Sequence, residues 1–430
     1  MSTSGGKAAP DVDLRAQGGS ERSFVVGGLV VVGLVVYNFI GPGPPESIVQ
    51  DGEEEAIQEA QWLTWVMWFF FRLVQIVVLG ALILLAVLVT QQRKIIYVPA
   101  PPGTQRSPKE NPRMYQSPDA WGLPYEDLMI ETEDGTKVNA WLIYQPLSAC
   151  KDQVPYTLVY FHGNAGNIGH RLENIRDMHD KLKVNILILD YRGYGDSEDG
   201  RGCTQKGFIM DALGTYRFLV ESINSGKYAA KTKMSTDRIL LFGRSIGGAV
   251  AIKVMADLLR ESLDAGGKGA LPLPAGLILE NTFTALRDMA VQIFPFLSVL
   301  KWLLAPPLLY DPWDSTDSLA FLTKRHEHWC CCLLSGLQDE IVPPEQMTAL
   351  HGILKTRRPK VLKFFRFPLG GHNDTPTKGG AEYWISFSKF MAEVVATEDE
   401  RREGLKALTA DGAAPAKADE ETSPETSKAD

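Results

Sequence analysis

The sequence predicts an α/β protein. We expect a mostly parallel, eight-stranded sheet with helices on both faces, preceded by two membrane-spanning helices. Short continuous apolar runs such as "YTLVYF", "VNILILD", "RILLFG" and "GLILE" alternate with amphipathic stretches, as expected of parallel strands covered on both faces. Two long apolar stretches precede them, which is typical of membrane helices. The 430 residues are 45% hydrophobic and 22% charged, which leaves room for a folded domain beside those helices.

The N-terminus is predicted to be a polar tail followed by a membrane helix. Residues 1–22 carry mixed charges and are expected to form a disordered cytosolic tail. Residues 23–41 hold "SFVVGGLVVVGLVVYNFI", an uncharged run that is just long enough to cross a bilayer. A cleaved signal peptide is the alternative interpretation. The run is followed by Gly-Pro-Gly-Pro-Pro rather than by a small-x-small cleavage site, which favours an uncleaved anchor.

A second membrane helix is predicted at residues 62–91. Its uncharged part, residues 73–90, is long enough to span the hydrocarbon core by itself. The start of the helix is rich in Trp and Phe at helical spacing, which is typical of an interfacial aromatic belt. Arg72 follows this belt, so its guanidinium can extend to the interface. A buried core helix is a poor alternative for so long an apolar run.

The distribution of charge predicts how the helices are oriented. The loop at residues 42–61 is acidic and contains no Lys or Arg, whereas the flank after the second helix is basic and the N-terminal tail contains Lys7, Arg15 and Arg22. By the positive-inside rule the loop is non-cytosolic, and everything after residue 91 faces the cytosol. If the first run were instead a cleaved signal peptide, the second helix would be a stop-transfer helix and the domain would still face the cytosol. The five cysteines include three in a row, Cys330 to Cys332, which cannot pair with one another in normal geometry and fit a reducing compartment.

The rest of the chain is predicted to be a linker, one α/β domain and a tail. Residues 92–124 are expected to be a linker because residues 99–124 hold many prolines, and residues 398–430 have the composition of a disordered tail. The α/β domain covers residues 125–397, and its first two strands flank Asp-Gly, which favours an antiparallel hairpin. The predicted strands are 125–131, 137–144, 156–161, 184–189, 238–243, 276–280, 329–335 and 362–367.

A candidate nucleophile lies in "RILLFGRSIGGAVAIKV", residues 238–254. Ser245 follows a predicted strand and precedes a predicted helix, which is the context that a nucleophile elbow requires. Gly243 and Gly247 remove side chains that would collide in the sharp turn. By itself the Gly-x-Ser-x-Gly pattern is weak, because glycine and serine are common in ordinary turns.

A serine hydroxyl needs a base, and the base needs an acid to orient it. Among the seven histidines, His372 is the best candidate by position, since it follows the last strand and two glycines. Asp339 lies just past the preceding strand, with Glu340 as the adjacent competitor and a simple turn aspartate as the alternative. The chain order Ser245, Asp339, His372 is the order expected for this arrangement.

Two backbone N–H groups are candidates for an oxyanion hole. One comes from the residue after the nucleophile, Ile246, and the other from the loop "YFHGNAGN" after an early strand. In that loop Gly163 lets the main chain approach and Asn164 is the expected donor. A phosphate-binding loop is the alternative, but the stretch lacks the Gly-Lys-Ser/Thr ending of such loops.

Six stretches in this order resemble the α/β-hydrolase superfamily. The similarity is to its eukaryotic membrane-anchored branch, which is related to fungal bud-emergence proteins and to enzymes that remove palmitate from proteins. It covers roughly residues 93–395 and implies Ser245 as nucleophile, Asp339 as acid and His372 as base. The stretches are "FHGNAGNIGHR", "LDYRGYGDSE", "FGRSIGGAVA", "LENTFTALRDMA", "SGLQDEIVPP" and "GGHND".

Three further expectations accompany the resemblance. Arg192 is expected to brace loops near the site mouth. The apolar insert at residues 281–320 lies where this fold often places a cap, although plain packing on the sheet is an equal alternative. Depalmitoylases of the family have an N-terminal cysteine cluster that carries lipid anchors, whereas the first cysteine here is Cys150, so the membrane helices would replace that anchor.

The expected function is that of a membrane-anchored serine hydrolase. Its substrates would be esters or thioesters of lipids or acylated proteins, without a cofactor or a metal. His326, His328 and the three cysteines are more simply core residues than metal ligands. The net charge of −8 argues against nucleic acid. The alternatives are a peptidase of prolyl-oligopeptidase type, for which no propeller-sized segment precedes the domain, and a catalytically silent membrane scaffold, which would be expected to lack a triad residue.

Overall fold

The structure is a computed structural model, and the chain divides into two units, Met1–Gln91 and Gln92–Asp430. The predicted tail at 1–22 and the first predicted membrane helix at 23–41 lie outside the described residues. The same holds for most of the apolar centre of the predicted cap. The structure describes residues 54–151, 153–266, 269–293, 295, 298, 306–356 and 359–411.

A long helix forms where the second membrane helix is predicted. Helix α2 spans Glu54–Ile96, so it begins inside the predicted acidic loop and extends past residue 91. Its part from Trp62 to Ile96 is long and apolar enough to cross a membrane, and none of its most apolar stretch is buried inside the protein. A helix with apolar side chains on all sides and no protein around them is suited to a lipid environment.

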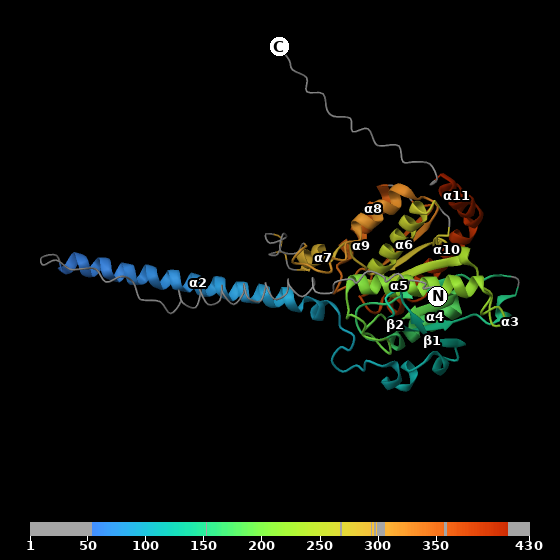
Figure 1. Cartoon of the computed structure of the whole chain (residues 1–430), viewed down its shortest axis with the longest axis horizontal. Helices are drawn as coiled ribbons and strands as arrows, with labels where there is room; N and C mark the ends of the chain where they lie inside the picture. The colour runs from blue at the N-terminus through green and yellow to red at the C-terminus, as the bar shows by residue number, and fades with distance from the viewer. Residues whose placement is uncertain are drawn as a thin grey trace, which may run out of the picture. The chain divides into compact units, whose positions relative to one another are not determined.

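The second unit contains the predicted eight-stranded sheet, in the order β1-β2-β4-β3-β5-β6-β7-β8. Figure 1 shows this unit with its helices packed around the sheet. Strands β3 to β8 run parallel, whereas β2 is antiparallel to both β1 and β4. The predicted hairpin is therefore confirmed, and each strand lies within one residue of its predicted bounds. The strands are β1 Tyr125–Glu131, β2 Lys137–Ile143, β3 Thr157–Phe161, β4 Asn185–Leu189, β5 Ile239–Arg244, β6 Gly276–Glu280, β7 Cys330–Gly336 and β8 Val361–Phe367.

Helices cover both faces of this sheet because successive strand residues point to opposite faces. One buried apolar cluster joins the sheet to α5, α6, α8 and α9, and the other joins it to α4 and α10. In β7, Cys331 belongs to the first cluster, and Cys330 and Cys332 to the second, which confirms the cysteines as strand core. The helices are α3 Leu147–Cys150, α4 Leu172–Leu182, α5 Gln205–Asn224, α6 Ile246–Asp264, α7 Leu286–Ile293, α8 Thr316–Arg325, α9 Pro344–Thr356, α10 Thr375–Ala396 and α11 Glu398–Asp411.

Two predicted boundaries need correction. The segment predicted as a linker at 92–124 belongs to the second unit, with Tyr97 buried in its core and three short 3₁₀ helices, Pro108–Glu110, Arg113–Tyr115 and Pro118–Trp121. The predicted tail at 398–430 begins instead with helix α11. Its first residue, Glu398, is buried and forms ion pairs of 2.8 and 2.7 Å with Arg238 and Arg402. The long-range pair with Arg238 and the pair with Arg402 one turn along stabilise a helix that its polar composition does not predict.

One buried histidine makes the stability of this fold pH-dependent. His326, at the end of α8, is buried, and its Nε2 has no hydrogen-bond partner among the described residues. Burial, with a smaller contribution from nearby His328, lowers its pKa from 6.5 to about 3. The folded protein therefore holds a neutral imidazole at pH values where the unfolded chain is protonated.

We expect the protein to lose stability as the pH falls below 6.5, the unfolded pKa of His326. In this range the unfolded state binds more protons, so each pH unit costs about 1.4 kcal/mol, or about 2 kcal/mol by pH 5. Thermal unfolding of the full chain in detergent at pH 7.5 and 5 measures this loss, and His326→Gln should reduce it. His351→Gln is the comparison: burial also lowers the pKa of this half-buried histidine, but less than that of His326, so its replacement should reduce the loss less. If the wild type and His326→Gln lost the same stability between pH 7.5 and 5, His326 would not be the source of the loss.

Candidate active site

Ser245 lies in a strained turn between β5 and α6. Its backbone has φ 55° and ψ −127°, a left-handed conformation that costs a non-glycine residue about 1–3 kcal/mol. Hydrogen bonds hold this conformation in place. The Ser245 N–H donates to the Glu280 carbonyl at 2.9 Å, and the Thr282 hydroxyl donates to the Ser245 carbonyl at 2.7 Å. Ser245 therefore has the backbone geometry of the predicted sharp turn between strand and helix.

The two glycines of the motif let main chains approach closely. A Cβ on Gly247 would overlap the carbonyls of Phe161 and His162, at the end of β3. A Cβ on Gly243 would overlap the main chain of Gly247. A side chain at either position would push α6 away from the ends of the neighbouring strands. These two glycines therefore allow the main chains around the turn to pack closely against one another.

The structure brings Asp339 and His372 together at the ends of β7 and β8. The imidazole Nδ1 lies 2.8 Å from Oδ2 of Asp339 and 3.1 Å from Oδ1. Oδ1 also accepts the N–H groups of Ile341 and Val342, at 2.9 and 2.7 Å, so the carboxylate is fixed from both sides. The competitor Glu340 accepts the main-chain N–H of His372 at 3.3 Å rather than a ring nitrogen. The geometry thus pairs the ring with Asp339.

A buried arginine that sequence reasoning did not single out joins the serine to the histidine loop. The guanidinium of Arg244 donates to the His372 carbonyl at 2.5 Å and to Oδ1 of Asn373 at 3.1 Å. Its Nε lies 3.3 Å from the Glu280 carboxylate, which also accepts the Tyr383 hydroxyl. Burial raises the pKa of Glu280, and Arg244 opposes that rise. Its only trace in the sequence is a charge that directly precedes Ser245, and this does not reveal its buried partner.

Asn281, just after β6, is a second residue that the sequence did not reveal. Its side-chain nitrogen donates to the carbonyls of Gly371 and His372, each at 3.2 Å. Its side-chain oxygen accepts the N–H of Gly336 at 2.8 Å. One buried amide therefore joins the ends of β6 and β7 to the loop that follows β8.

The loop predicted to form the oxyanion hole passes directly against Ser245. An ideal Cβ built on Gly163 would lie 3.4 Å from the Cβ of Ser245. The buried ring of His162 supports this loop, with Nδ1 lying 2.7 Å from the Gly163 carbonyl. Ile246 is the first residue of α6, and the first N–H groups of a helix have no intrahelical acceptor. Asn164 and Ile246 remain the predicted donors.

Arg192 connects two segments, of which one is a turn and the other a helix rather than a second loop. Its guanidinium binds Asp134 in the turn between β1 and β2 at 2.7 Å, and Asp211 on α5 at 2.8 Å. The hydrogen bond from Arg192 holds the pKa of Asp134 well below its usual range. This network fixes the turn that carries "YRGYGD".

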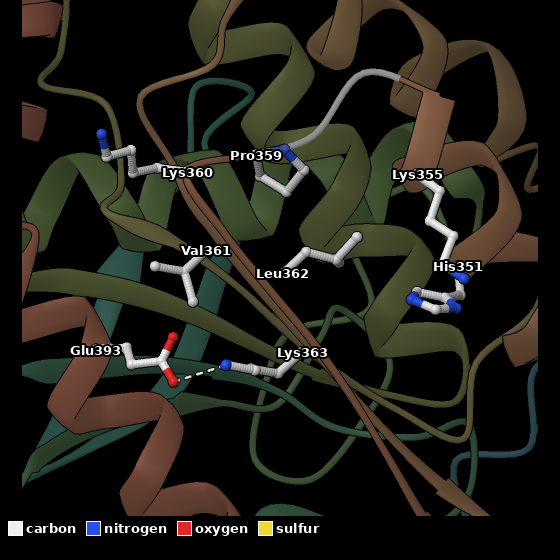
Figure 2. A pocket seen from close by; sticks show the side chains of 8 residues that line it. All are labelled: His351, Lys355, Pro359, Lys360, Val361, Leu362, Lys363 and Glu393. Atoms are coloured by element: carbon white, nitrogen blue, oxygen red, sulfur yellow. Dashed lines mark ion pairs between the residues drawn. The ribbon is translucent and has the colours of Figure 1, made fainter.

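A surface cavity of about 320 Å³ lies away from these residues, beside the start of β8 (Figure 2). Ser245, Asp339 and His372 are not among its lining residues. One of its lysines, Lys363, forms a 2.6 Å ion pair with Glu393, which Figure 2 shows. The lining residues are His351, Lys355, Pro359, Lys360, Val361, Leu362, Lys363 and Glu393. We assign the candidate chemistry to the residues around Ser245.

Comparison with known proteins shows the class to which this fold and site belong. The chain is 36% identical over 339 residues to the α/β-hydrolase domain-containing protein WAV2 of Arabidopsis thaliana, covering 76% of this chain and 95% of that protein. It is 33% identical over 312 residues to the protein bem46 of Schizosaccharomyces pombe, covering 73% and 89%. An uncharacterized membrane protein of Saccharomyces cerevisiae is 32% identical over 277 residues, covering 64% and 83%. No family model matches the sequence.

The chain therefore belongs to the α/β-hydrolase superfamily. Within it, the chain is a member of the eukaryotic branch that contains WAV2 and bem46.

Removing Arg244 should destabilise the domain strongly. Arg244→Met leaves the buried Glu280 carboxylate without its cation and the His372 carbonyl without its donor, and the loss of one partner of a buried pair costs about 3–5 kcal/mol. Chemical unfolding of the full chain measures this change, and adding Glu280→Gln should recover part of it. The control is Arg106→Met, which breaks a surface pair with Asp199 and should cost less than about 1 kcal/mol. Equal losses for the two arginine variants would show that the pair does not support the fold.

Proposed function

We propose that this protein is a serine hydrolase that cleaves ester or thioester bonds. Ser245 is the nucleophile, His372 the general base and Asp339 the acid that orients the imidazole. The observation that carries the proposal is the Asp339–His372 pair of 2.8 Å, tied through Arg244 to a serine in a strained elbow. The membership in a hydrolase superfamily supports the same assignment.

The chemistry follows from which imidazole nitrogen is engaged. Asp339 accepts a hydrogen bond from Nδ1–H, so Nε2 is the nitrogen that can take the proton of Ser245. The Ser245 oxygen then attacks the carbonyl carbon, and the N–H groups of Asn164 and Ile246 stabilise the negative oxygen. His372 passes the proton to the leaving alcohol or thiol, and an acyl-enzyme remains. Water, deprotonated by His372, attacks the acyl-enzyme and releases the acid, which restores Ser245.

The substrates that we propose are lipids or acylated proteins in or at a membrane. The apolar helix Trp62–Ile96 is suited to a bilayer, and a relative in yeast is named a membrane protein. The apolar sequence of residues 294–305 is suited to contact with an acyl chain or with the bilayer surface. We further propose a two-pass hairpin that leaves the hydrolase domain in the cytosol, as the charge distribution favours.

The topology is tested by protease access to sealed vesicles. Protease added to vesicles with the cytosolic side outward should remove the hydrolase domain and leave a protected fragment that contains both apolar stretches. Adding detergent is the control for protease activity. Full protection of the domain before detergent would contradict the cytosolic orientation.

The catalytic proposal is tested by labelling membranes with a fluorophosphonate probe, which reacts with activated serines. Wild-type protein should be labelled, and Ser245→Ala should abolish labelling. Ser262→Ala removes a buried serine of helix α6, which follows Ser245, and should leave labelling intact. Asp339→Asn should slow labelling by about 10⁴-fold, because the imidazole loses its correct tautomer. Labelling that survives Ser245→Ala, or a wild type that is never labelled, would refute the proposal.

A further inference from the structure

The side chain of Asn164 is held by two groups from distant parts of the chain. The Tyr194 hydroxyl donates a hydrogen bond to Oδ1 of Asn164 at 2.9 Å. The main-chain N–H of Val98 donates to the same oxygen at 3.3 Å and to the Tyr194 hydroxyl at 3.1 Å. Val98 also forms a parallel β-bridge with Ala165. The loop predicted to carry the oxyanion donor is therefore fastened through both its side chain and its main chain.

Val98 follows the end of helix α2 closely, and the preceding residues are fixed within the same unit. The Gln92 amide donates to the Leu308 carbonyl and accepts the Tyr310 N–H, both at 2.9 Å. Arg93 forms an ion pair of 2.9 Å with Asp311. These contacts fix Gln92 and Arg93 against the same segment of the second unit, residues 308–311.

Aromatic packing also holds Tyr194 and Tyr97, the residue before Val98, in place. The Tyr97 hydroxyl accepts a hydrogen bond from the Trp313 indole at 3.0 Å. The rings of Tyr97 and Tyr194 lie against Phe208, with ring centroids 4.9 and 5.6 Å away. Tyr194 is buried, and burial raises its pKa. Its hydroxyl thus stays protonated and can donate to Asn164 while it accepts the Val98 N–H.

We propose that Tyr194 and the Val98 N–H are positioning groups for the oxyanion loop. This inference rests on the proposed function, in which the Asn164 N–H stabilises the developing negative charge. Such a donor acts only if it is already in place when the charge forms. Because Oδ1 of Asn164 takes both bonds and Gly163 lies against Ser245, the loop cannot turn away without breaking them. The segment that follows helix α2 thereby supports the oxyanion loop.

The test is Tyr194→Phe in the full chain, assayed with p-nitrophenyl octanoate and with the fluorophosphonate probe. This change removes one hydroxyl and keeps the ring packing. We expect kcat and the labelling rate to fall about 10-fold, as is typical when a residue that orients a reacting group is lost, with KM nearly unchanged. Tyr216→Phe is the matched control, because this buried hydroxyl donates at 2.6 Å to the Pro272 carbonyl, outside the site. It should change stability by a similar amount and leave kcat unchanged.

A double-mutant cycle tests whether Tyr194 acts through Asn164. Asn164→Ala should lower kcat by itself, and Tyr194→Phe should then cause no further loss, because the shared hydrogen bond is already absent. If the double variant loses kcat by the product of the two separate factors, or if Tyr194→Phe alone has wild-type kcat, the inference is wrong. Neither result would affect the proposed function, which fails only if the wild type itself neither hydrolyses the ester nor reacts with the probe. Measuring the wild type first separates the two failures.

Discussion

The buried pair of Arg244 and Glu280 is the interaction on which the site depends. Burying two charges is costly unless the geometry is good and their remaining polar atoms are satisfied. Here the guanidinium also binds the carbonyl of His372 and the side chain of Asn373, and the carboxylate accepts the Tyr383 hydroxyl. One pair thus connects β5, β6, α10 and the loop after β8. Oε1 of Glu280 faces the guanidinium at 3.3 Å without a hydrogen bond, so the other bonds of the pair offset only part of the desolvation cost, and they also fix where the histidine lies.

Strand order explains why the site needs this connection. In a parallel sheet, side chains that follow the strands gather at one edge. Asp339 and His372 follow the adjacent strands β7 and β8, so they meet directly. Ser245 follows β5, and β6 lies between β5 and β7. The gap is bridged by the residues at the end of β6, where Glu280 pairs with Arg244 and Asn281 binds the loop carrying His372. The intervening strand therefore links the turn that carries Ser245 to the loop that carries His372.

The sequence predicted the sheet closely and the bonds around the site only in part. Strand bounds were recovered within one residue, since strands buried on both faces are continuous apolar runs that end abruptly. Ser245, Asp339 and His372 could be found because each follows such a run. Arg244 could not, because a charged residue at a strand end has the same local pattern whether it faces water or a buried carboxylate. Helix α11 was missed for a similar reason, as its partner Arg238 lies far away in the sequence.

Local sequence patterns also failed to show where the α/β-hydrolase domain begins after helix α2. The first predicted strand begins at 125, which makes the preceding residues look like a spacer. In the structure Tyr97 belongs to the core and Val98 pairs with Ala165, so the domain includes the exit of the helix. A segment that merely preceded the domain would make no such contacts. The Val98 N–H also donates to Oδ1 of Asn164, so a fragment starting at the first strand would lack one partner of Asn164 as well as the bridge to Ala165. The folded domain therefore begins well before its first strand.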